Sequence, residues 1–288
     1  MRVAAIQMVS GPEVDANLRE AGRLLEHAAA QGARLAALPE NFAIMGLRDT
    51  DKIRVREAAG DGPIQSFLSQ TARRLAIWIV GGSVPLEAQV PDKVRNSCLV
   101  FDDTGRCVSR YDKIHLFGLE MGAERHSEER TIEAGSEVVA VDSPFGRLGL
   151  SICYDLRFPE LYRAMGRVDL IMVPSAFTRV TGAAHWESLL RARAIENLAY
   201  VVAPAQGGRH ASGRETHGDT LISDPWGVVL SRLGQGPGVI VADLDRPYQD
   251  RLRASLPALN HRRIRVGGPA PQSPDVPSEI RERQNDPA

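Results

Sequence analysis

The strongest structural signal in this chain is the stretch LGLSICYDLRFPE, residues 148–160. Its first part, Leu148 to Ile152, is apolar and indicates a β-strand. Pro159 suits the first turn of a helix, so the chain passes from strand to helix within a few residues. Cys153 stands at this turn, where a helix N-terminus would lower its pKa from about 8.5 and favour the nucleophilic thiolate. The stretch therefore predicts a catalytic cysteine at a strand-to-helix elbow of an α/β protein.

The cysteines can also be interpreted as structural residues. Cys98 and Cys107 lie inside predicted strands beside apolar residues, and a buried packing role is expected for both. The same role is the alternative for Cys153. Three cysteines without a C-x-x-C pair argue against a disulfide framework and against a zinc site. We therefore expect no metal, and a reducing, cytoplasmic location.

Short β-rich runs alternate with amphipathic helices along most of the chain. The predicted strands cover residues 3–9, 35–38, 77–80, 97–101, 138–141, 148–152, 170–173, 200–203 and 239–242, and the clearest helices cover about 18–29 and 185–197. Turn signals at 102–105, 144–146 and 225–227 add antiparallel hairpins. This is more strand than one open sheet commonly holds, so we expect two stacked sheets with outer helices, a four-layer αββα sandwich.

The composition is that of one ordinary globular domain followed by a tail. Hydrophobic residues make up 43% and charged residues 25% of the chain, close to average values. No linker interrupts residues 1–266, which we expect to form one domain. Residues 267–288 are rich in proline and polar residues and are expected to form a flexible tail.

Charge and hydropathy argue against two classes of partner. The formal net charge is -1, with 35 basic and 36 acidic residues interspersed, so the positive field that nucleic-acid binding requires is missing. No apolar stretch approaches the roughly 18 residues that span a bilayer. We expect a soluble protein that binds neither nucleic acid nor membrane.

Two further ionisable residues follow predicted strands. Glu40 comes directly after the apolar run Leu35 to Leu38 and Pro39, and Lys113 ends another β-rich run. Strand ends are where α/β enzymes commonly place catalytic groups. Taken singly, each could be an ordinary solvated loop residue. Together with Cys153, they indicate a nucleophile, a proton carrier and a cation.

Three segments resemble the nitrilase superfamily, also called the carbon-nitrogen hydrolases. They are LPENF (38–42), YDKIHLF (111–117) and ICYDLRFPEL (152–161), in family order within a match over about residues 1–265. The resemblance implies an αββα sandwich with Glu40 as general base, Lys113 as oxyanion partner and Cys153 as a nucleophile that forms a thioester. It implies no cofactor and no metal. It also implies a homodimer or a higher homo-oligomer, for which the helix near His185 is a candidate contact.

Supporting residues are assigned through the same resemblance. Family members carry a second glutamate after the lysine, and Glu128 aligns best with it, although Glu129 remains possible. The backbone N–H of Tyr154 would face the oxyanion, and Thr178 lies in a segment that matches the family. Arg209 is a candidate for binding a substrate carboxylate, with Arg179, His210 and Arg214 as further candidates.

Later segments resemble the branch that contains deaminated glutathione amidases and omega-amidases, and are closer to the former. They are PSAFT (174–178), TGAAHWE (181–187), RARAIEN (191–197), QGGRH (206–210), DPWG (224–227) and LPALNHRR (256–263). This implies a small-molecule amide substrate, deaminated glutathione, cleaved to 2-oxoglutarate and cysteinylglycine. The alternatives are an omega-amidase acting on 2-oxoglutaramate, another amidase, nitrilase or carbamoylase, and a scaffold protein without catalysis. A histidine partner for Cys153, as in papain-like enzymes, is a further alternative.

Overall fold

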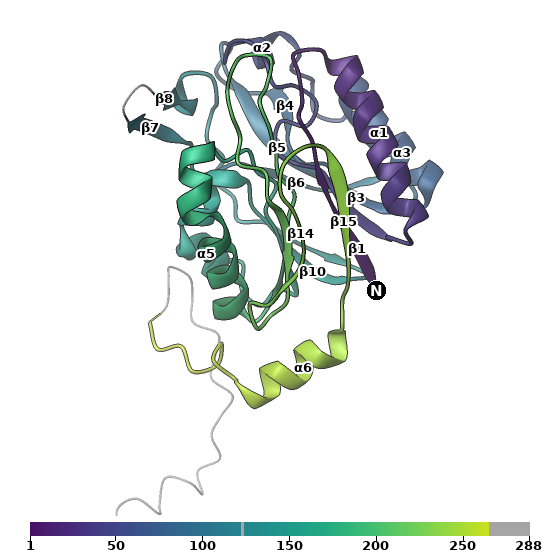
Figure 1. Ribbon diagram of the computed structural model, residues 1–288, viewed down its shortest axis with the longest axis vertical. Helices are drawn as coiled ribbons and strands as arrows, with labels where there is room; N and C mark the ends of the chain where they lie inside the picture. The colour runs from purple at the N-terminus through teal and green to yellow at the C-terminus, as the bar shows by residue number, and fades with distance from the viewer. Residues whose placement is uncertain (122–123, 265–288) are drawn as a thin grey trace, which may run out of the picture.

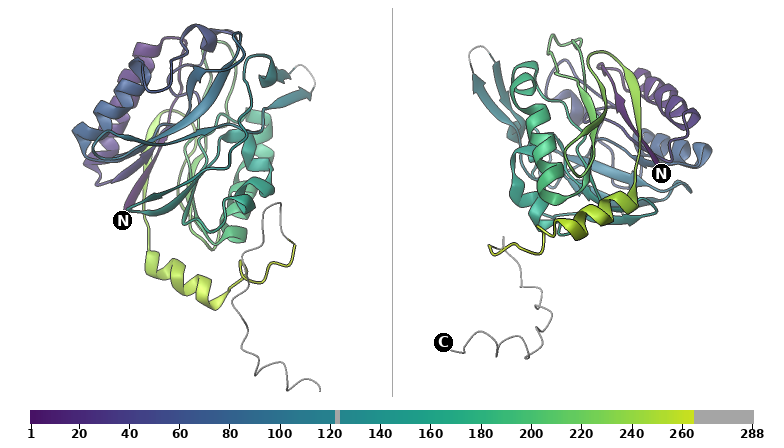
Figure 2. Two further views of the ribbon diagram at one scale, coloured as in Figure 1. Left: turned by 180° about the vertical axis from the view of Figure 1, so that it is seen from behind. Right: turned by 60° about the horizontal axis from the view of Figure 1, so that its bottom comes forward.

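Two β-sheets lie face to face and carry helices on their outer sides (Figure 1). The computed structural model describes residues 1–121 and 124–264. The predicted tail, residues 267–288, lies outside the described residues. The views in Figure 2 show the two sheets with helices α1 and α3 on one outer side and α5 on the other. The expected four-layer αββα sandwich is confirmed.

The first sheet has seven strands. Their order is β15 (Gly238–Asp243), β1 (Arg2–Gln7), β2 (Leu35–Ala37), β3 (Trp78–Val80), β5 (Val94–Phe101) and β4 (Val84–Glu87), with β6 (Cys107–Asp112) also paired with β5. Strands β1, β2 and β3 are parallel, and β15 runs antiparallel to β1 with Arg2 opposite Asp243. The carboxyl ends of the parallel strands therefore meet at one edge.

The second sheet has six strands. Their order is β14 (Val229–Leu233), β13 (Thr220–Ser223), β12 (Tyr200–Ala203), β11 (Leu170–Met172), β10 (Gly146–Leu150) and β9 (Ala140–Ser143). Strands β10, β11 and β12 are parallel. A separate hairpin, β7 (Gly118–Met121) with β8 (Glu124–Ser127), projects from the body of the molecule (Figure 1).

The helices cover the outer faces. The α-helices are α1 (Val14–Ala30), α2 (Asp51–Arg54), α3 (Pro63–Leu75), α4 (Pro159–Ala164), α5 (Arg179–Asn197) and α6 (Arg246–Ser255), and the 3-10 helices are η1 (Glu128–Arg130) and η2 (Cys153–Arg157). Helix α5 begins six residues before the predicted start, because the Thr178 hydroxyl accepts a hydrogen bond from the Thr181 N–H and caps it. Helix α3 was not predicted.

Burial on both faces of each sheet explains the continuous apolar strands. Along β1, Val3 and Ala5 join a hydrophobic cluster that also contains strands of the second sheet, whereas Ala4 and Ile6 join the cluster beneath α1 and α3. Successive side chains of a strand point to opposite faces, so both sets are apolar when a sheet is covered on both sides. The predicted hairpins at 102–105, 144–146 and 225–227 are confirmed by antiparallel pairing of the strands that flank them.

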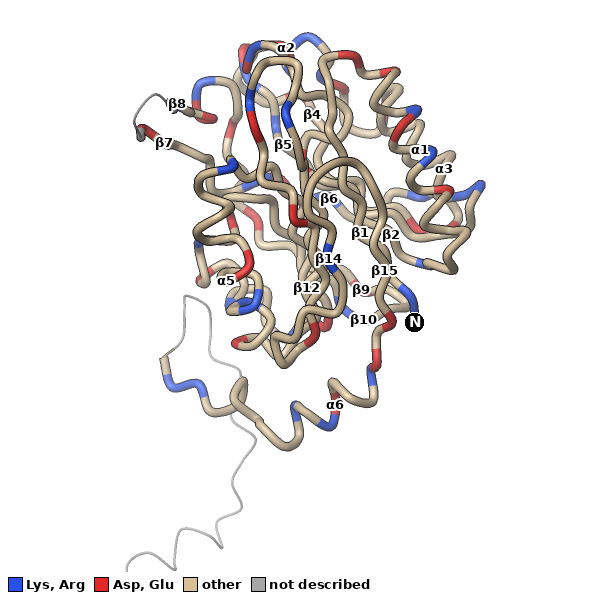
Figure 3. The backbone as a smooth tube through the Cα atoms, in the orientation of Figure 1, with Lys and Arg blue, Asp and Glu red and all other residues tan. Residues whose placement is uncertain are grey.

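Basic and acidic residues alternate along the described backbone and are not segregated to one part of it (Figure 3). None of the helices in residues 1–121 and 124–264 is long and apolar enough to cross a membrane.

Candidate active site

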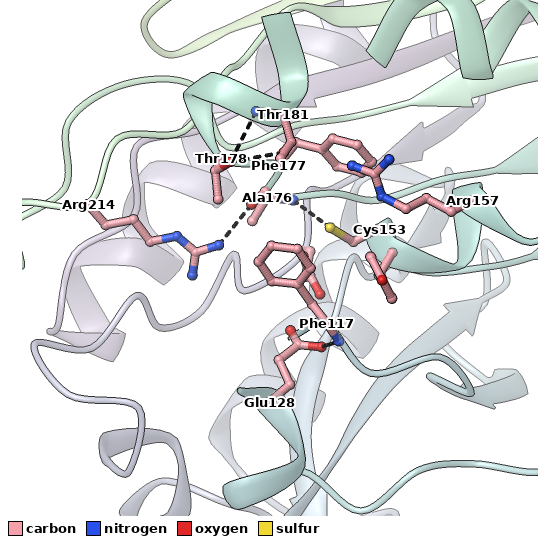
Figure 4. A pocket seen from close by; sticks show the side chains of 11 residues that line it. Phe117, Glu128, Cys153, Arg157, Ala176, Phe177, Thr178, Thr181 and Arg214 are labelled. Atoms are coloured by element: carbon pink, nitrogen blue, oxygen red, sulfur yellow. Dashed lines mark hydrogen bonds between the residues drawn. The ribbon is translucent and has the colours of Figure 1, made fainter. Parts of the chain in front are cut away.

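The ends of three strands bring Glu40, Lys113 and Cys153 into one region. Glu40 follows β2, Lys113 directly follows β6, and Cys153 begins η2 after β10. Glu40 and Cys153 line a cavity together with Glu128 and Tyr154 (Figure 4), and its empty space of about 280 Å³ is partly open to solvent. Lys113 is not among the residues that line this cavity, but its fully buried side chain contacts Glu40 and Glu128, which do line it. The site therefore lies where strand ends of both sheets meet.

Cys153 occupies a sharp backbone turn. Its φ angle is 52°, in the left-handed region that non-glycine residues rarely adopt. The turn is held by a 2.9 Å hydrogen bond from the Cys153 N–H to the Pro174 carbonyl. Sγ accepts a 3.5 Å hydrogen bond from the Ala176 N–H, drawn in Figure 4. Strained backbone of this kind concentrates at functional sites, because the surrounding fold must maintain it.

The expectation of a lowered pKa for Cys153 is wrong. The thiol is 7% exposed, and its burial raises the pKa well above the usual value, as does the nearby carboxylate of Glu40. Lys113 and the Ala176 N–H lower the pKa but do not compensate. The predicted helix is also a short 3-10 turn at this point, so few aligned peptide dipoles act on the sulfur. The nucleophile therefore rests as a thiol and requires a base.

The two side-chain oxygens of Glu40 differ in their hydrogen bonding. Its Oε1 accepts hydrogen bonds from Lys113 Nζ at 2.8 Å and from Asn96 Nδ2 at 3.0 Å. Within the described residues, Oε2 has no hydrogen-bond partner. The residue is 2% exposed, so solvent hardly reaches it. This arrangement leaves one carboxylate oxygen able to exchange a proton at the cavity.

Lys113 is held between two carboxylates. Its Nζ lies 2.8 Å from Glu128 Oε2 as well as 2.8 Å from Glu40 Oε1. Burial lowers the pKa of Lys113, but Glu128 and Glu40 outweigh it and raise the pKa well above the usual range. The ammonium is therefore permanently charged and fixed in position.

Glu128 contacts both the Lys113 ammonium and the backbone of Phe117. Its Oε2 also accepts a 2.7 Å hydrogen bond from the Phe117 N–H. Burial raises its pKa, whereas Lys113 and then Lys52 lower it, and the net shift is downward. Glu129, the other glutamate left open by the sequence, is exposed.

Asp155 is a site residue that the sequence analysis missed. The buried carboxylate accepts hydrogen bonds from the Tyr111 hydroxyl at 2.7 Å and from the N–H groups of Ile152 and His115 at 2.9 and 3.0 Å. His115 Nδ1 lies 2.7 Å from the same side chain. Asp155 thus joins the segment that carries Lys113 to the elbow that carries Cys153. Its position within the quoted motif was a signal, but only the fold showed its partners.

The remaining predicted residues are divided between the cavity and the surface. Tyr154 and Thr178 line the cavity, where Thr178 also caps α5. The Tyr154 N–H belongs to the first turn of η2, where N–H groups lack a partner within the helix. Arg209 is exposed and does not line the cavity, whereas Arg214 of the same loop does. Arg157 lines the wall near Phe177 and was also missed.

Among the described residues, no group of three or more His, Cys, Asp or Glu side chains is placed to hold a metal ion. The histidines that the sequence left open as partners of Cys153 are His115, His185, His210 and His217, and none of them lines the cavity. His115 faces Asp155, and His210 contacts Ser10 and Thr216. The groups in reach of the cysteine are therefore carboxylates and a buried ammonium.

The model of the Carbon-nitrogen hydrolase family matches residues 2–254. The chain belongs to the carbon-nitrogen hydrolase family. The resemblance to this family is thereby confirmed, and the protein is a hydrolase of carbon-nitrogen bonds other than peptide bonds.

Known members of the carbon-nitrogen hydrolases are similar over nearly the full length. A deaminated glutathione amidase of Synechocystis is 42% identical over 265 residues, which cover 90% of this chain and 97% of that protein. A deaminated glutathione amidase of Yersinia enterocolitica is 38% identical, with 91% and 93% covered. The crystal structure of Nit3 from Saccharomyces cerevisiae, a member of branch 10 of the nitrilase superfamily, superimposes with a TM-score of 0.82 at 30% identity, covering 92% of this chain and 97% of that one.

Proposed function

We propose that this chain is an amidase that hydrolyses deaminated glutathione to 2-oxoglutarate and cysteinylglycine through a thioester on Cys153. The observation that carries the proposal is the similarity, over at least nine-tenths of both chains, to two proteins named deaminated glutathione amidase. The cavity supports it, because Cys153 and Glu40 are accompanied by two arginines, Arg157 and Arg214, that suit an acidic substrate.

In the first half-reaction, Glu40 takes the proton of the Cys153 thiol as Sγ attacks the amide carbonyl carbon. The raised pKa of the thiol makes this proton transfer necessary, and the open Oε2 of Glu40 can accept the proton. The Lys113 ammonium and the Tyr154 N–H stabilise the oxyanion. The carbon-nitrogen bond then breaks, the leaving amine takes the proton from Glu40, and the acyl group remains on sulfur.

In the second half-reaction, Glu40 takes a proton from water, and the hydroxide attacks the thioester carbonyl. The same two donors stabilise the second oxyanion. The carbon-sulfur bond breaks, Sγ recovers a proton from Glu40, and the carboxylic acid leaves. The enzyme returns to its starting protonation state without a cofactor.

The test is a comparison of kcat/KM for deaminated glutathione and for 2-oxoglutaramate, measured as release of 2-oxoglutarate. Cys153→Ala is the blank. A preference for deaminated glutathione supports the proposal, and a preference for 2-oxoglutaramate moves the assignment to omega-amidase. Activity on neither substrate rejects both, and normal activity of Cys153→Ala rejects the mechanism.

We further propose that residues 1–266 form one catalytic domain that works in the cytoplasm, where a reducing environment keeps Cys153 as a thiol. A homodimer through α5 is the accompanying proposal. Ile195 of α5 and Trp226 in the β13–β14 turn are 48% and 54% exposed, and Arg191 Nε hydrogen-bonds the Gly227 carbonyl to join these two segments. Light scattering of the wild type and of Ile195→Asp tests this: the wild type should have twice the chain mass, and the variant half of that.

A further inference from the structure

A second recess opens beside the catalytic cavity and shares Arg214 with it. It encloses about 710 Å³ of empty space, part of which is open to solvent. Its wall includes the loop after Glu40 and helix α2, which carries Lys52. Arg214 lines both spaces, and its guanidinium points toward the centre of the catalytic cavity in Figure 4.

The lining of the recess is strongly cationic. It contains Arg48, Lys52, Arg125 and Arg214, and Asp49 is the single carboxylate among its lining residues. The Arg125 guanidinium is 3.3 Å from Glu120. An imbalance of this kind, inside a concave space next to a catalytic site, favours an anionic ligand.

Arg214 is only partly satisfied by the protein. Its Nη2 donates a 3.0 Å hydrogen bond to the Ala176 carbonyl, while its Nε is buried without a hydrogen-bond partner. Within the described residues it has no carboxylate within ion-pair distance. A buried guanidinium N–H without a partner is unfavourable unless a ligand accepts from it.

Lys52 is the second cation without a direct partner. In residues 1–121 and 124–264, its ammonium forms no hydrogen bond and no ion pair within 4 Å. Burial lowers its pKa, although Glu128, Asp49 and Glu40 raise it. An anion bound in the recess would supply the missing charge.

We propose that Arg214 and Lys52 form a subsite that binds a carboxylate of the substrate while the scissile amide lies against Cys153. The inference rests on the proposed function, because deaminated glutathione carries one carboxylate on its 2-oxo acid end and another on its glycine end. Both carboxylates are a few bonds from the scissile amide. Either carboxylate could therefore reach the recess, and the experiment below determines which of the two binds there.

The experiment measures kcat/KM of the wild type, Lys52→Met and Arg214→Gln on three substrates. These are deaminated glutathione, its glycinamide, and an analogue with a methyl group in place of the 2-oxo acid carboxylate. A charge-assisted hydrogen bond contributes about 1.5–3 kcal/mol, so each variant should lose about 10- to 100-fold in kcat/KM on deaminated glutathione. The loss should be mainly in KM and should largely disappear on the analogue that lacks the bound carboxylate.

Arg209→Gln is the matched control, since Arg209 is exposed on the same loop and lines neither space. It should stay within about 2-fold of the wild type, as is usual for an exposed residue. Equal losses on all three substrates, or a larger loss in Arg209→Gln than in Arg214→Gln, would overturn the subsite. Thermal melts of the variants separate misfolding from lost binding.

Calorimetric titration with 2-oxoglutarate and with cysteinylglycine tests the subsite without turnover. Lys52→Met and Arg214→Gln should weaken the binding of one of these two acids. If the wild type does not hydrolyse deaminated glutathione but binds one acid in a manner that depends on Lys52 and Arg214, the proposed function fails and the subsite stands. If the wild type binds neither acid, or the variants bind both as the wild type does, the subsite fails.

Discussion

The Tyr111 hydroxyl donates a 2.7 Å hydrogen bond to Asp155, so a residue two positions before Lys113 is fixed to a residue two positions after Cys153. Both side chains are fully buried. The cation and the nucleophile come from different sheets, and this contact helps to set their separation. Asp155 also accepts hydrogen bonds from the Ile152 and His115 N–H groups, so the two segments are joined at more than one point.

Replacement of Asp155 by Ala should cost both stability and activity. It leaves the buried Tyr111 O–H and Ile152 N–H without their acceptor, at about 1–3 kcal/mol each. Urea unfolding should show a loss of about 3 kcal/mol or more, and kcat should fall because the elbow is released. Tyr111→Phe, which removes one of these hydrogen bonds, should lose less in both measurements. Unchanged kcat in Asp155→Ala would rule out the positioning role.

Replacement of Lys113 by Met should remove most activity. The ammonium is the charged donor for the oxyanion, and the loss of one such donor lowers kcat by about 10²–10³. The buried carboxylate of Glu40 and the partly buried carboxylate of Glu128 would then lack their shared cation, so the free energy of unfolding should also fall. The variant Arg110→Gln, on the preceding strand, is the comparison for stability. Rates near the wild type for Lys113→Met would contradict the role of Lys113.

Replacement of Glu40 by Gln should make Cys153 easier to alkylate at low pH while it abolishes amide turnover. The carboxylate of Glu40 helps to raise the pKa of the thiol, so Glu40→Gln should lower that pKa. Iodoacetamide labelling of Cys153 should therefore reach half its maximum rate at a lower pH in Glu40→Gln than in the wild type. Amide turnover should nevertheless be lost, because no group remains to protonate the leaving amine.

Mass spectrometry of the labelled peptides distinguishes Cys153 from the exposed Cys107, which serves as an internal reference. A pH midpoint that rises in Glu40→Gln would refute the electrostatic coupling between the two residues.

Glu128 should make the stability of the protein depend on pH in the acid range. Its pKa lies below its usual value of 4.5, because Lys113 and Lys52 outweigh the effect of burial. A carboxylate with a lowered pKa in the folded state stabilises the protein fully above the unfolded pKa, and this contribution disappears as the pH falls through the folded pKa. The difference in unfolding free energy between the wild type and Glu128→Gln should thus be largest near neutral pH and should shrink below about pH 4.5. A difference that grows on acidification would contradict this assignment.

Most of the fold could be predicted from local patterns. The strand of residues 200–203 has the predicted bounds, and the hairpin turns stand where glycine and proline place them. Strands such as β1 are buried on both faces and are therefore apolar throughout. Such continuous apolar runs can be recognised in the sequence without the structure. Helix α3 was not predicted, although it begins at Pro63 and proline is common at the first position of a helix. The β7–β8 hairpin also escaped, since an acidic run usually forms a solvated loop.

The reactive groups could also be named from the sequence, because each follows a predicted strand and stands in a segment that resembles the carbon-nitrogen hydrolases. Their spacing along the chain did not show that the three converge. The sequence by itself therefore determined a covered two-sheet fold and supplied a cysteine, a glutamate and a lysine at strand ends. Tertiary structure alone decided that the Cys153 thiol is protonated at rest, that Asp155 links the two halves of the site, and that Arg214 rather than Arg209 faces the cavity. The reason is physical: strand and helix patterns arise from neighbours along the chain, whereas burial, charge and direction at a site depend on residues more than 40 positions apart that only the packed sheets bring together.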